Sequence, residues 1–330
     1  MYKVSEKMKF TQDKFEKFDE LTKDLQIETA QNLLNRGLVN LTQTSKPHLV
    51  LFKPMVDVRK LLYCVVCGEH AKVQSMLEKD CSLIFKRGKV TDCSGREFES
   101  ISAFEYVLWA LDKHMWAAMI ACIPSNEESR GVFVQLLAQY NKVNTDGVTY
   151  RLNGNTITEQ HFDFENTIIK ELKTQVKEMK KQVDSVNAHN PTGDAIDNWD
   201  AIDNQWREGV GGAQKLLPMH IVDEYCSNEP FYPVPQFTSQ PKSSKQFYNW
   251  TTKKDEDWFN LNSKMGVDLA IYKGRGDRTL GCGHVGIAAS RDDLGAISAL
   301  CEVRTMDFIK LKSLLEERAT LDNYHQVVPM

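Results

Sequence analysis

The chain has 330 residues and a mass of 37.7 kDa, enough for one large or two ordinary domains with a buried core. Lys and Arg number 41 against 45 Asp and Glu, and the net charge of -4 argues against a generally basic nucleic-acid binder. The longest clean apolar run, Met115 to Ile123, has nine residues and is too short for a membrane span, which needs about 20. Eight cysteines are too few for a disulfide scaffold, so we expect a soluble chain with reduced thiols in a reducing compartment.

The N-terminal segment, residues 1–46, predicts a helix. Aromatic and leucine residues recur there at roughly helical spacing with charges between them, and Gly37 is a natural helix stop. The first residues lack the apolar core of a signal peptide. The apolar stretch from Pro47 to Pro54 predicts a linker or an edge strand, because prolines close it at both ends.

From Arg59 onward the chain repeats one pattern, in which a short apolar helix, a Gly or Asp at the turn and a second amphipathic helix follow one another. The three units span residues 59–78, 102–122 and 298–317. Helix pairs of this kind stack into a shared core, because one pair alone leaves a face unburied. We therefore expect a repeat region over residues 47–193 and a C-terminal unit, residues 291–330, that packs back on it.

The units resemble ankyrin repeats. Leu61, Cys64, Val65 and Gly68 occupy the positions of the family's Leu, Ala, Ala and Gly. The full Thr-Pro-Leu-His signature is absent, and the first two units start farther apart than the family's period of about 33 residues. The resemblance implies degenerate repeats, and the extra residues around 88–95 predict a hairpin or finger between them.

A second resemblance covers more of the chain. The run Val90–Asp112, and Leu217–Cys226 continuing to Phe247–Trp250, look like blocks shared among Legionella and Coxiella proteins, many of which are type IV secreted effectors with ankyrin-like regions. The resemblance implies a virulence protein that a bacterium delivers into the cytoplasm of a host cell. There it would bind a host protein through the repeat surface, without catalysis of its own.

A hairpin and a long helix follow the second unit. Asn153-Gly154 between alternating residues predicts a type I′ turn. Thr156 and Glu159 have the spacing of a capping box at the start of a helix. Apolar residues then step through 162–186 in a heptad-like stripe. This stripe either packs along its own domain or pairs two copies of the chain as a homodimer.

Residues 194–290 predict an inserted lobe of mixed and irregular structure. The acidic tandem Asp194–Asn204 fits a short amphipathic helix better than a calcium loop, because it lacks the central Gly. Four prolines within residues 229–241 predict irregular, extended chain. The fold class is therefore mainly α, within α+β. It combines ankyrin-like helix pairs, a long helix, one or two β-hairpins and this lobe.

The alternative to a binding protein is an enzyme, a thiol hydrolase or a transferase, that acts on a host protein. The candidate catalytic residues of such an enzyme are Cys282 as nucleophile and His284 or His220 as base. Neighbouring Cys and His residues in the sequence do not establish the geometry that such chemistry needs. For His220, which lies four residues before Glu224, the simpler interpretation is a buried His bonded to a neighbouring carboxylate.

Two further patterns involve ligand-binding residue types. Arg275 and Arg278 stand among glycines that let backbone N–H groups approach an anion, so they form a candidate anion site, with a plain surface loop as the alternative. Cys64, Cys67 and His70 have the residue types of a zinc site. The two cysteines fall where a repeat helix needs small apolar residues, which favours a packed core. We therefore expect no metal and no cofactor.

Overall fold

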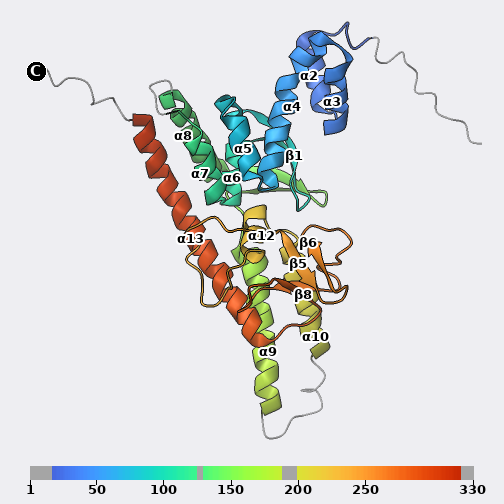
Figure 1. The fold of residues 1–330 in the computed structure, drawn as a ribbon, viewed down its shortest axis with the longest axis vertical. Coiled ribbons are helices and arrows are strands. Elements are labelled where there is room, and N and C mark those ends of the chain that lie inside the picture. The colour runs from blue at the N-terminus through green and yellow to red at the C-terminus, as the bar shows by residue number, and fades with distance from the viewer. Residues whose placement is uncertain (1–16, 125–128, 188–198, 321–330) are drawn as a thin grey trace, which may run out of the picture. The chain divides into compact units, whose positions relative to one another are not determined.

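The structure is a computed structural model that describes residues 17–124, 129–187 and 199–320. The chain divides into two units, Met1–Lys60 and Leu61–Met330 (Figure 1). No helix in the described ranges is long and apolar enough to cross a membrane, which agrees with the short apolar runs of the sequence.

The described residues of the first unit, from residue 17 onward, form the helices α2 (Lys23–Gln31), α3 (Asn35–Thr44) and α4 (Lys46–Val66), the last of which continues into the second unit. Their shared core contains Ala30, Leu38, Leu41 and Phe52. Arg59 donates to the backbone oxygens of Gln31 and Leu33, at 2.6 Å each, across the turn between α2 and α3.

The prediction of one N-terminal helix over residues 1–46 is wrong for its described part, because the chain turns between α2 and α3. Gly37 lies inside α3 rather than after a helix. The predicted linker or strand at 47–54 is also wrong, since these residues lie within α4. Pro47 falls in the first turn of α4, where the missing N–H would be unpaired anyway, and the helix runs on through Pro54. Residues 1–16 of the predicted helix lie outside the described residues.

The first half of the second unit combines helices with a small antiparallel sheet. After α4 come α5 (His70–Leu77), the 3-10 turn η1 (Cys81–Phe85), β1 (Arg87–Thr91), β2 (Glu97–Ser102), α6 (Ala103–Ala110), α7 (Lys113–Ala121), α8 (Ser129–Asp146), β3 (Val148–Leu152) and β4 (Asn155–Glu159). The sheet has the order β1-β2-β3-β4. The finger predicted around 88–95 is confirmed as the β1–β2 hairpin.

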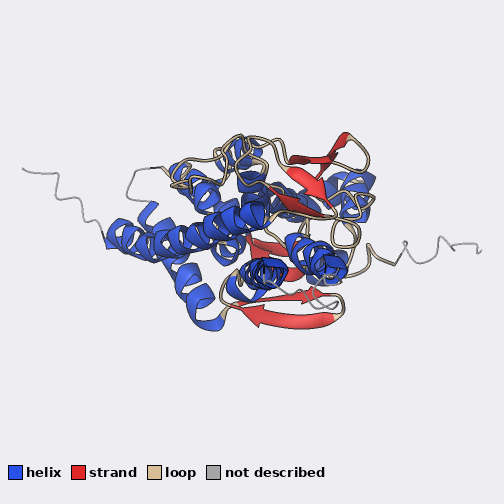
Figure 2. Cartoon of the chain, turned by 90° about the horizontal axis from the view of Figure 1, so that it is seen from below, coloured by secondary structure: helices blue, strands red, loops and turns tan. Residues whose placement is uncertain are grey.

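The second half carries a mixed sheet and the longest helix. Its elements are the π-helical turn η2 (Glu165–Ile169), α9 (Lys170–Asn187), α10 (Trp199–Asn204), the π-helical turn η4 (Gln205–Val210), α11 (Gly211–Gln214), α12 (Met219–Tyr225), β5 (Gln246–Asn249), β6 (Lys254–Asp257), β7 (Ala270–Tyr272), β8 (Leu280–Cys282) and α13 (Ile287–Thr320). The sheet has the order β6-β5-β8-β7, with β5 and β8 parallel. Figure 2 shows the two sheets as separate, with helices between them.

Helix pairs lie where the first two repeat units were predicted, and the ankyrin-like classification itself stays a prediction. The end of α4 meets α5 through Gly68, whose φ of +65° suits a glycine, and α6 meets α7 through Leu111, which is left-handed at φ +59°. The third unit is not a pair, because α13 runs straight through Asp307. The Asp307 carboxylate pairs with Lys113 and Arg304 instead of ending a helix.

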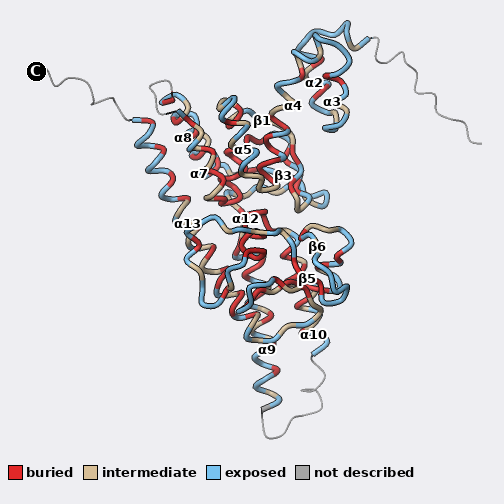
Figure 3. Tube along the Cα trace, in the orientation of Figure 1, coloured by how far each residue is buried: buried red, intermediate tan, exposed pale blue. Residues whose placement is uncertain are grey.

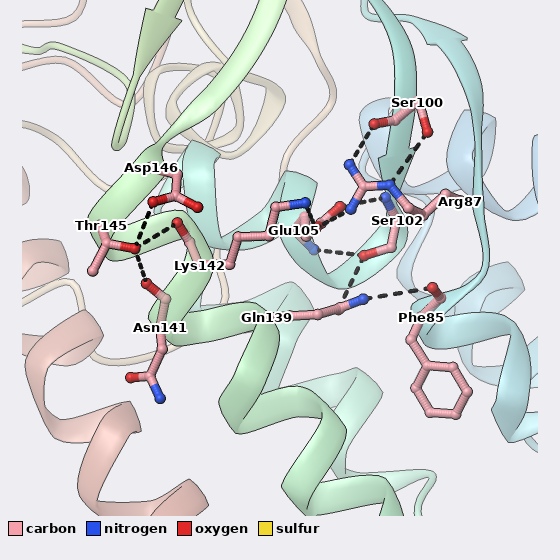
Figure 4. Close-up of polar contacts among 10 residues, drawn as sticks. All are labelled: Phe85, Arg87, Ser100, Ser102, Glu105, Gln139, Asn141, Lys142, Thr145 and Asp146. Carbon is pink, nitrogen blue, oxygen red and sulfur yellow. Dashed lines mark hydrogen bonds and ion pairs between the residues drawn. The ribbon is translucent and has the colours of Figure 1, made fainter.

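A buried carboxylate ties the β1–β2 hairpin to α6 and α8 (Figure 4). Glu105 accepts from the backbone N–H of Ser102 at 3.0 Å, and the Ser102 hydroxyl accepts in return from the N–H of Glu105, which completes a capping box for α6. Arg87 of β1 and Lys142 of α8 pair with the same carboxylate. All eight residues of α6 are buried, so this helix is the centre of the first half.

The hairpin predicted at Asn153-Gly154 is confirmed, since both residues have positive φ, +50° and +81°, as a type I′ turn requires. The predicted capping box of Thr156 and Glu159 is wrong, because both residues lie in β4. Glu159 instead accepts from the indole N–H of Trp109, at 3.0 Å.

The long helix predicted over 162–186 corresponds to η2 and α9, so it begins later than the stripe does. Leu172 and Met179 are buried, and α9 packs on α13, whereas Val183 and Val186 near its end are exposed. Figure 3 shows this change from buried to exposed along α9. The first interpretation of the stripe, packing within the chain, accounts for its buried part, and the homodimer stays a prediction.

The predicted lobe at 194–290 combines short helices with the mixed sheet, and the four-proline segment lacks helix and strand, as expected. The predicted acidic helix is seen for its described part as α10, with Ile202 buried. Residues 194–198 of the tandem lie outside the described residues.

Candidate protein-binding groove

An apolar groove of about 350 Å³ lies between α7 and α13. We call it the α7–α13 groove, and its lining residues are Lys113, Trp116, Ala117, Ile120, Ala121, Asp307, Lys310, Leu311 and Leu314. Both helices contribute residues at steps of three and four, which places each set on one face of its helix. The groove is therefore the space between two helix faces that approach without closing.

Aromatic packing around Phe308 fixes the position of α13, which forms one wall of the groove. Phe308 stacks on Tyr140 of α8, with ring centroids 4.5 Å apart, and meets Trp116 edge-on at 6.5 Å. These contacts hold α13 firmly against α8, whereas α13 meets α7 more sparsely. Exposed Ala117 and Ala121 are too small to fill the remaining space, so the apolar side chains around them stay open to solvent.

The charged residues of the groove leave a positive balance. Lys113 pairs with Asp307 at 3.3 Å at one end. Lys310 has no ion pair with any residue in the described ranges. Leu314, at 41% exposure, continues the apolar wall beyond Lys310.

A buried polar network lies on the same two helices, one turn from the groove. Arg304 of α13 donates to the Glu224 carboxylate at 2.9 Å and to the backbone oxygen of Phe237 at 2.9 Å, and its guanidinium lies 3.1 Å from His114 Nε2. Burial raises the pKa of Glu224 to about 7, although Arg304 opposes the shift. Burial, followed by the nearby Arg304 charge, lowers the pKa of His114 to about 4. The contacts of Arg304 join α13 to α12, to α7 and to the segment that contains Phe237.

His220, a suspected catalytic base, is a buried structural residue in this arrangement. Its Nε2 lies 2.6 Å from the backbone oxygen of Ala110, which joins α12 to the end of α6. Desolvation lowers its pKa to about 4, so the ring is neutral near pH 7 and Nε2 donates this bond. His220 lies in α12, and the predicted carboxylate partner is wrong, because the bond goes to a carbonyl.

Cys282 is at the end of β8, and its thiol donates to the backbone oxygen of His284 at 2.6 Å. Burial raises the pKa of this thiol to about 11, so the nucleophilic thiolate is scarce at neutral pH. No contact among the described residues joins the Cys282 sulfur to a ring nitrogen of His284 or His220. The geometry does not support the thiol-enzyme alternative.

The two arginines of the candidate anion site are already engaged. Arg275 pairs with Asp292 at 2.9 Å and stacks on Tyr232, and Arg278 pairs with Asp255 at 2.7 Å. Carboxylates therefore occupy the positions that an anion would take.

The described residues include no group of three His, Cys, Asp or Glu side chains placed to hold a metal ion. Cys64 is buried among apolar residues, as a core position requires, whereas Cys67 lies just beyond α4 and is partly exposed. Its sulfur is 3.7 Å from that of Cys93.

Sequence reasoning did not identify the groove. Trp116 and Ile120 belong to the apolar run from Met115 to Ile123, and Trp116 is buried while Ile120 is partly buried. The signal in the sequence is the pair of alanines on α7, Ala117 and Ala121, together with Leu314 on α13. These residues line a groove only because the fold places the two helices side by side.

The chain is 35% identical over 277 residues to the uncharacterized protein CBUA0006 of Coxiella burnetii (strain RSA 493 / Nine Mile phase I). The alignment covers 78% of this chain and 75% of that protein. The chain belongs to the CBUA0006 family. Residues 167–315 match the model of the CBUA0006 C-terminal domain, which takes in the α13 wall of the groove but not α7. No solved structure matches the chain.

Proposed function

We propose that this member of the CBUA0006 family is a binding protein whose α7–α13 groove holds an amphipathic helix of a partner protein. The observation that supports the proposal is an apolar groove whose walls are two helix faces with residues at steps of three and four. Helices bind in such grooves through apolar residues at the same spacing, and they need no reacting group in the receptor.

The charges around the groove favour one chemistry for the occupant. Lys310 projects from the wall without a described counter-ion, whereas Lys113 is already paired with Asp307. We therefore infer that the occupant carries Asp or Glu beside its apolar stripe, positioned to meet Lys310. A strongly basic helix would meet like charge at this point.

The origin of the partner is a separate part of the proposal. The resemblance to Legionella and Coxiella effectors, together with the relationship to a Coxiella protein, supports a host protein as the partner and a type IV system as the route. The degenerate repeats contribute to this surface, because α7 is the second helix of the second predicted unit.

Site-specific photo-crosslinking tests the proposal. A benzophenone amino acid replaces Ala117 inside the groove, and the full-length chain is irradiated in host-cell lysate. Mass spectrometry then identifies the cross-linked peptide. We expect one recurrent segment with apolar residues at helical spacing and an acidic flank.

Two matched positions are controls. Leu261, which is 99% exposed, lies in the other half of the unit, and Ile309 is on α13 but does not line the groove. The same label at these positions should not capture that segment. Equal capture at all three positions, a captured segment without a helical apolar stripe, or capture only of a second copy of this chain would each contradict the proposed occupant.

A further inference from the structure

Two cysteines from separate elements meet at the end of α4, and neither lines the α7–α13 groove. Cys67 follows the last turn of α4, and Cys93 is in the tight turn between β1 and β2. Their sulfur atoms are 3.7 Å apart, and the Cys93 thiol is also 3.6 Å from the backbone oxygen of Val66. The two reduced thiols are therefore in direct contact, and a disulfide, with its sulfur–sulfur bond of about 2.05 Å, would bring them about 1.7 Å closer.

The turn geometry places Cys67 in this position. Gly68 has a φ of +65°, and a Cβ on it would lie 2.9 Å from Met219 Cγ and 3.3 Å from a carboxylate oxygen of Asp223. A side chain there would push the turn away from α12. Lys245 donates to the backbone oxygen of Cys67 at 2.6 Å and so fixes the turn from the other side.

The surroundings of Cys67 stabilise its thiolate. Cys93 and the Tyr63 hydroxyl donate to it, and the Lys245 ammonium is nearby, while burial and Glu69 act in the opposite direction. The balance lowers the pKa of Cys67 to about 7. The same contact raises the pKa of Cys93, because Cys93 keeps its proton while it faces a thiolate. A partly exposed thiolate beside a second thiol is the arrangement found in redox-responsive cysteine pairs.

We propose that Cys67 and Cys93 are a peroxide-reactive thiol pair that closes to a reversible disulfide. In the first step the Cys67 thiolate attacks one oxygen of hydrogen peroxide. A sulfur–oxygen bond forms, the oxygen–oxygen bond breaks, and the departing hydroxide takes a proton to become water. Cys67 is then a sulfenic acid and carries no charge.

In the second step Cys93 resolves the sulfenic acid. Loss of the charge on Cys67 removes the main reason that Cys93 held its proton, so its sulfur attacks the sulfur of Cys67. The sulfur–sulfur bond forms, the sulfur–oxygen bond breaks, and water leaves with the Cys93 proton. In sum, two thiols are oxidised to one disulfide and one peroxide is reduced to two waters. Thiols of the cell reverse the change by exchange.

The disulfide would join the end of α4 to the β1–β2 turn. That turn also contacts the segment before α12, because the Ser94 hydroxyl donates to the backbone oxygen of Leu217 at 3.1 Å. The modification therefore fixes a place where three elements of the second unit meet, and it does not depend on whether the groove binds a helix.

Mass spectrometry of the full-length chain tests the proposal. The reduced protein is treated with hydrogen peroxide, free thiols are blocked by alkylation, and tryptic peptides are analysed without reduction. We expect a Cys67–Cys93 cross-linked peptide as the main product, lost after treatment with dithiothreitol. In a Cys93→Ser variant, dimedone should instead label Cys67 as a trapped sulfenic acid.

Further variants separate the roles of the neighbours. Cys122→Ser, which changes another partly exposed thiol, should leave the product unchanged. Lys245→Gln and Tyr63→Phe should slow the alkylation of Cys67 severalfold at pH 7. A main product that joins Cys67 to Cys64, equal dimedone labelling of several cysteines, or no disulfide at peroxide levels that oxidise the exposed methionines would overturn the proposal. Circular dichroism of each variant confirms that it is folded before comparison.

Discussion

The helix α13 meets its neighbours in two different ways along its length. At Arg304 the contacts are polar and buried, and one guanidinium contacts α12, α7 and the backbone of the proline-rich segment. Further along α13 the contacts are apolar, and Leu311 is buried whereas Leu314 is exposed in the wall of the α7–α13 groove. The contacts of the polar region lie within the chain, whereas the apolar region leaves side-chain surface exposed.

The two regions depend on each other. His114 and Lys113, at the start of α7, contact Arg304 and Asp307 of α13, so the polar region sets how far apart the two helices stand. Beyond that end the wall on α7 includes the small, exposed residues Ala117 and Ala121. We therefore expect changes in the polar region to affect stability and changes in the groove to affect binding.

The largest expected effect is the loss of Arg304. Arg304→Met removes the buried guanidinium that donates to the Glu224 carboxyl group and to the backbone oxygen of Phe237, and it should reduce the free energy of unfolding by about 3–5 kcal/mol. Urea denaturation measures this change. Lys312→Met removes from the same helix a charge whose ion pair with Glu316 is exposed, and it should change the free energy of unfolding by no more than about 0.5 kcal/mol. Equal effects of the two variants would contradict the distinction between the regions.

His220 should make stability depend on pH. Its folded pKa of about 4 is below the value of about 6.5 for an unfolded His, so between these values the unfolded chain binds more protons. The stability that neutral His220 contributes is therefore full above about pH 6.5 and is lost as the pH falls towards 4, in total about 3 kcal/mol. His220→Gln keeps a donor for Ala110 but does not titrate. The stability difference between the two proteins should change over this range, and a constant difference would show that His220 is not buried in the neutral form.

A smaller effect is expected at Glu105. Glu105→Gln keeps an acceptor for the α6 cap but loses the ion pairs with Arg87 and Lys142. Both cations are partly exposed, so the cost should be about 1–2 kcal/mol. Glu99→Gln, at an exposed position with two cationic partners, should cost less than about 0.5 kcal/mol in the same urea titration. If Glu99→Gln lowered the free energy of unfolding as much as Glu105→Gln does, surface ion pairs rather than the buried carboxylate would stabilise the hairpin.

The smallest effect on stability should come from the groove itself. Leu314→Lys should change the free energy of unfolding by only about 0.5 kcal/mol, as should Ile309→Lys on the opposite side of α13. Leu315→Lys, at a fully buried position, should destabilise the chain strongly. A large cost at Leu314 would mean that this residue holds α13 in place and is not available to a partner.

The sequence predicted local structure best where one residue type has a strong conformational preference. Asn153-Gly154 specified its turn, and the four prolines of residues 229–241 specified irregular chain. It failed where tertiary contacts decide the outcome. Aspartate is common in turns, so Asp307 predicted the end of a helix. In the structure it pairs with Lys113 and Arg304, and α13 continues as one helix.

The candidate sites show the same limit. Cys282 and His284 are close in the sequence, but the thiol donates to the backbone oxygen of His284 and not to its ring. Cys67 and Cys93 are 26 positions apart, and their contact depends on how the β1–β2 hairpin lies against the end of α4. Proximity in the sequence is therefore a poor guide to chemistry in this chain, and only the fold brings the informative pairs together.

The most direct test of the central claim is the affinity of the partner segment for two variants of α13. The peptide captured at Ala117 is synthesised with a fluorescent label, and its binding to the wild type, Leu314→Glu and Ile309→Glu is measured by anisotropy. We predict that Leu314→Glu weakens binding by about tenfold or more, through lost apolar contact and repulsion of the acidic flank, while Ile309→Glu binds like the wild type. Equal affinity for all three proteins, or an equal loss in both variants, would contradict the claim that the α7–α13 groove is the binding site.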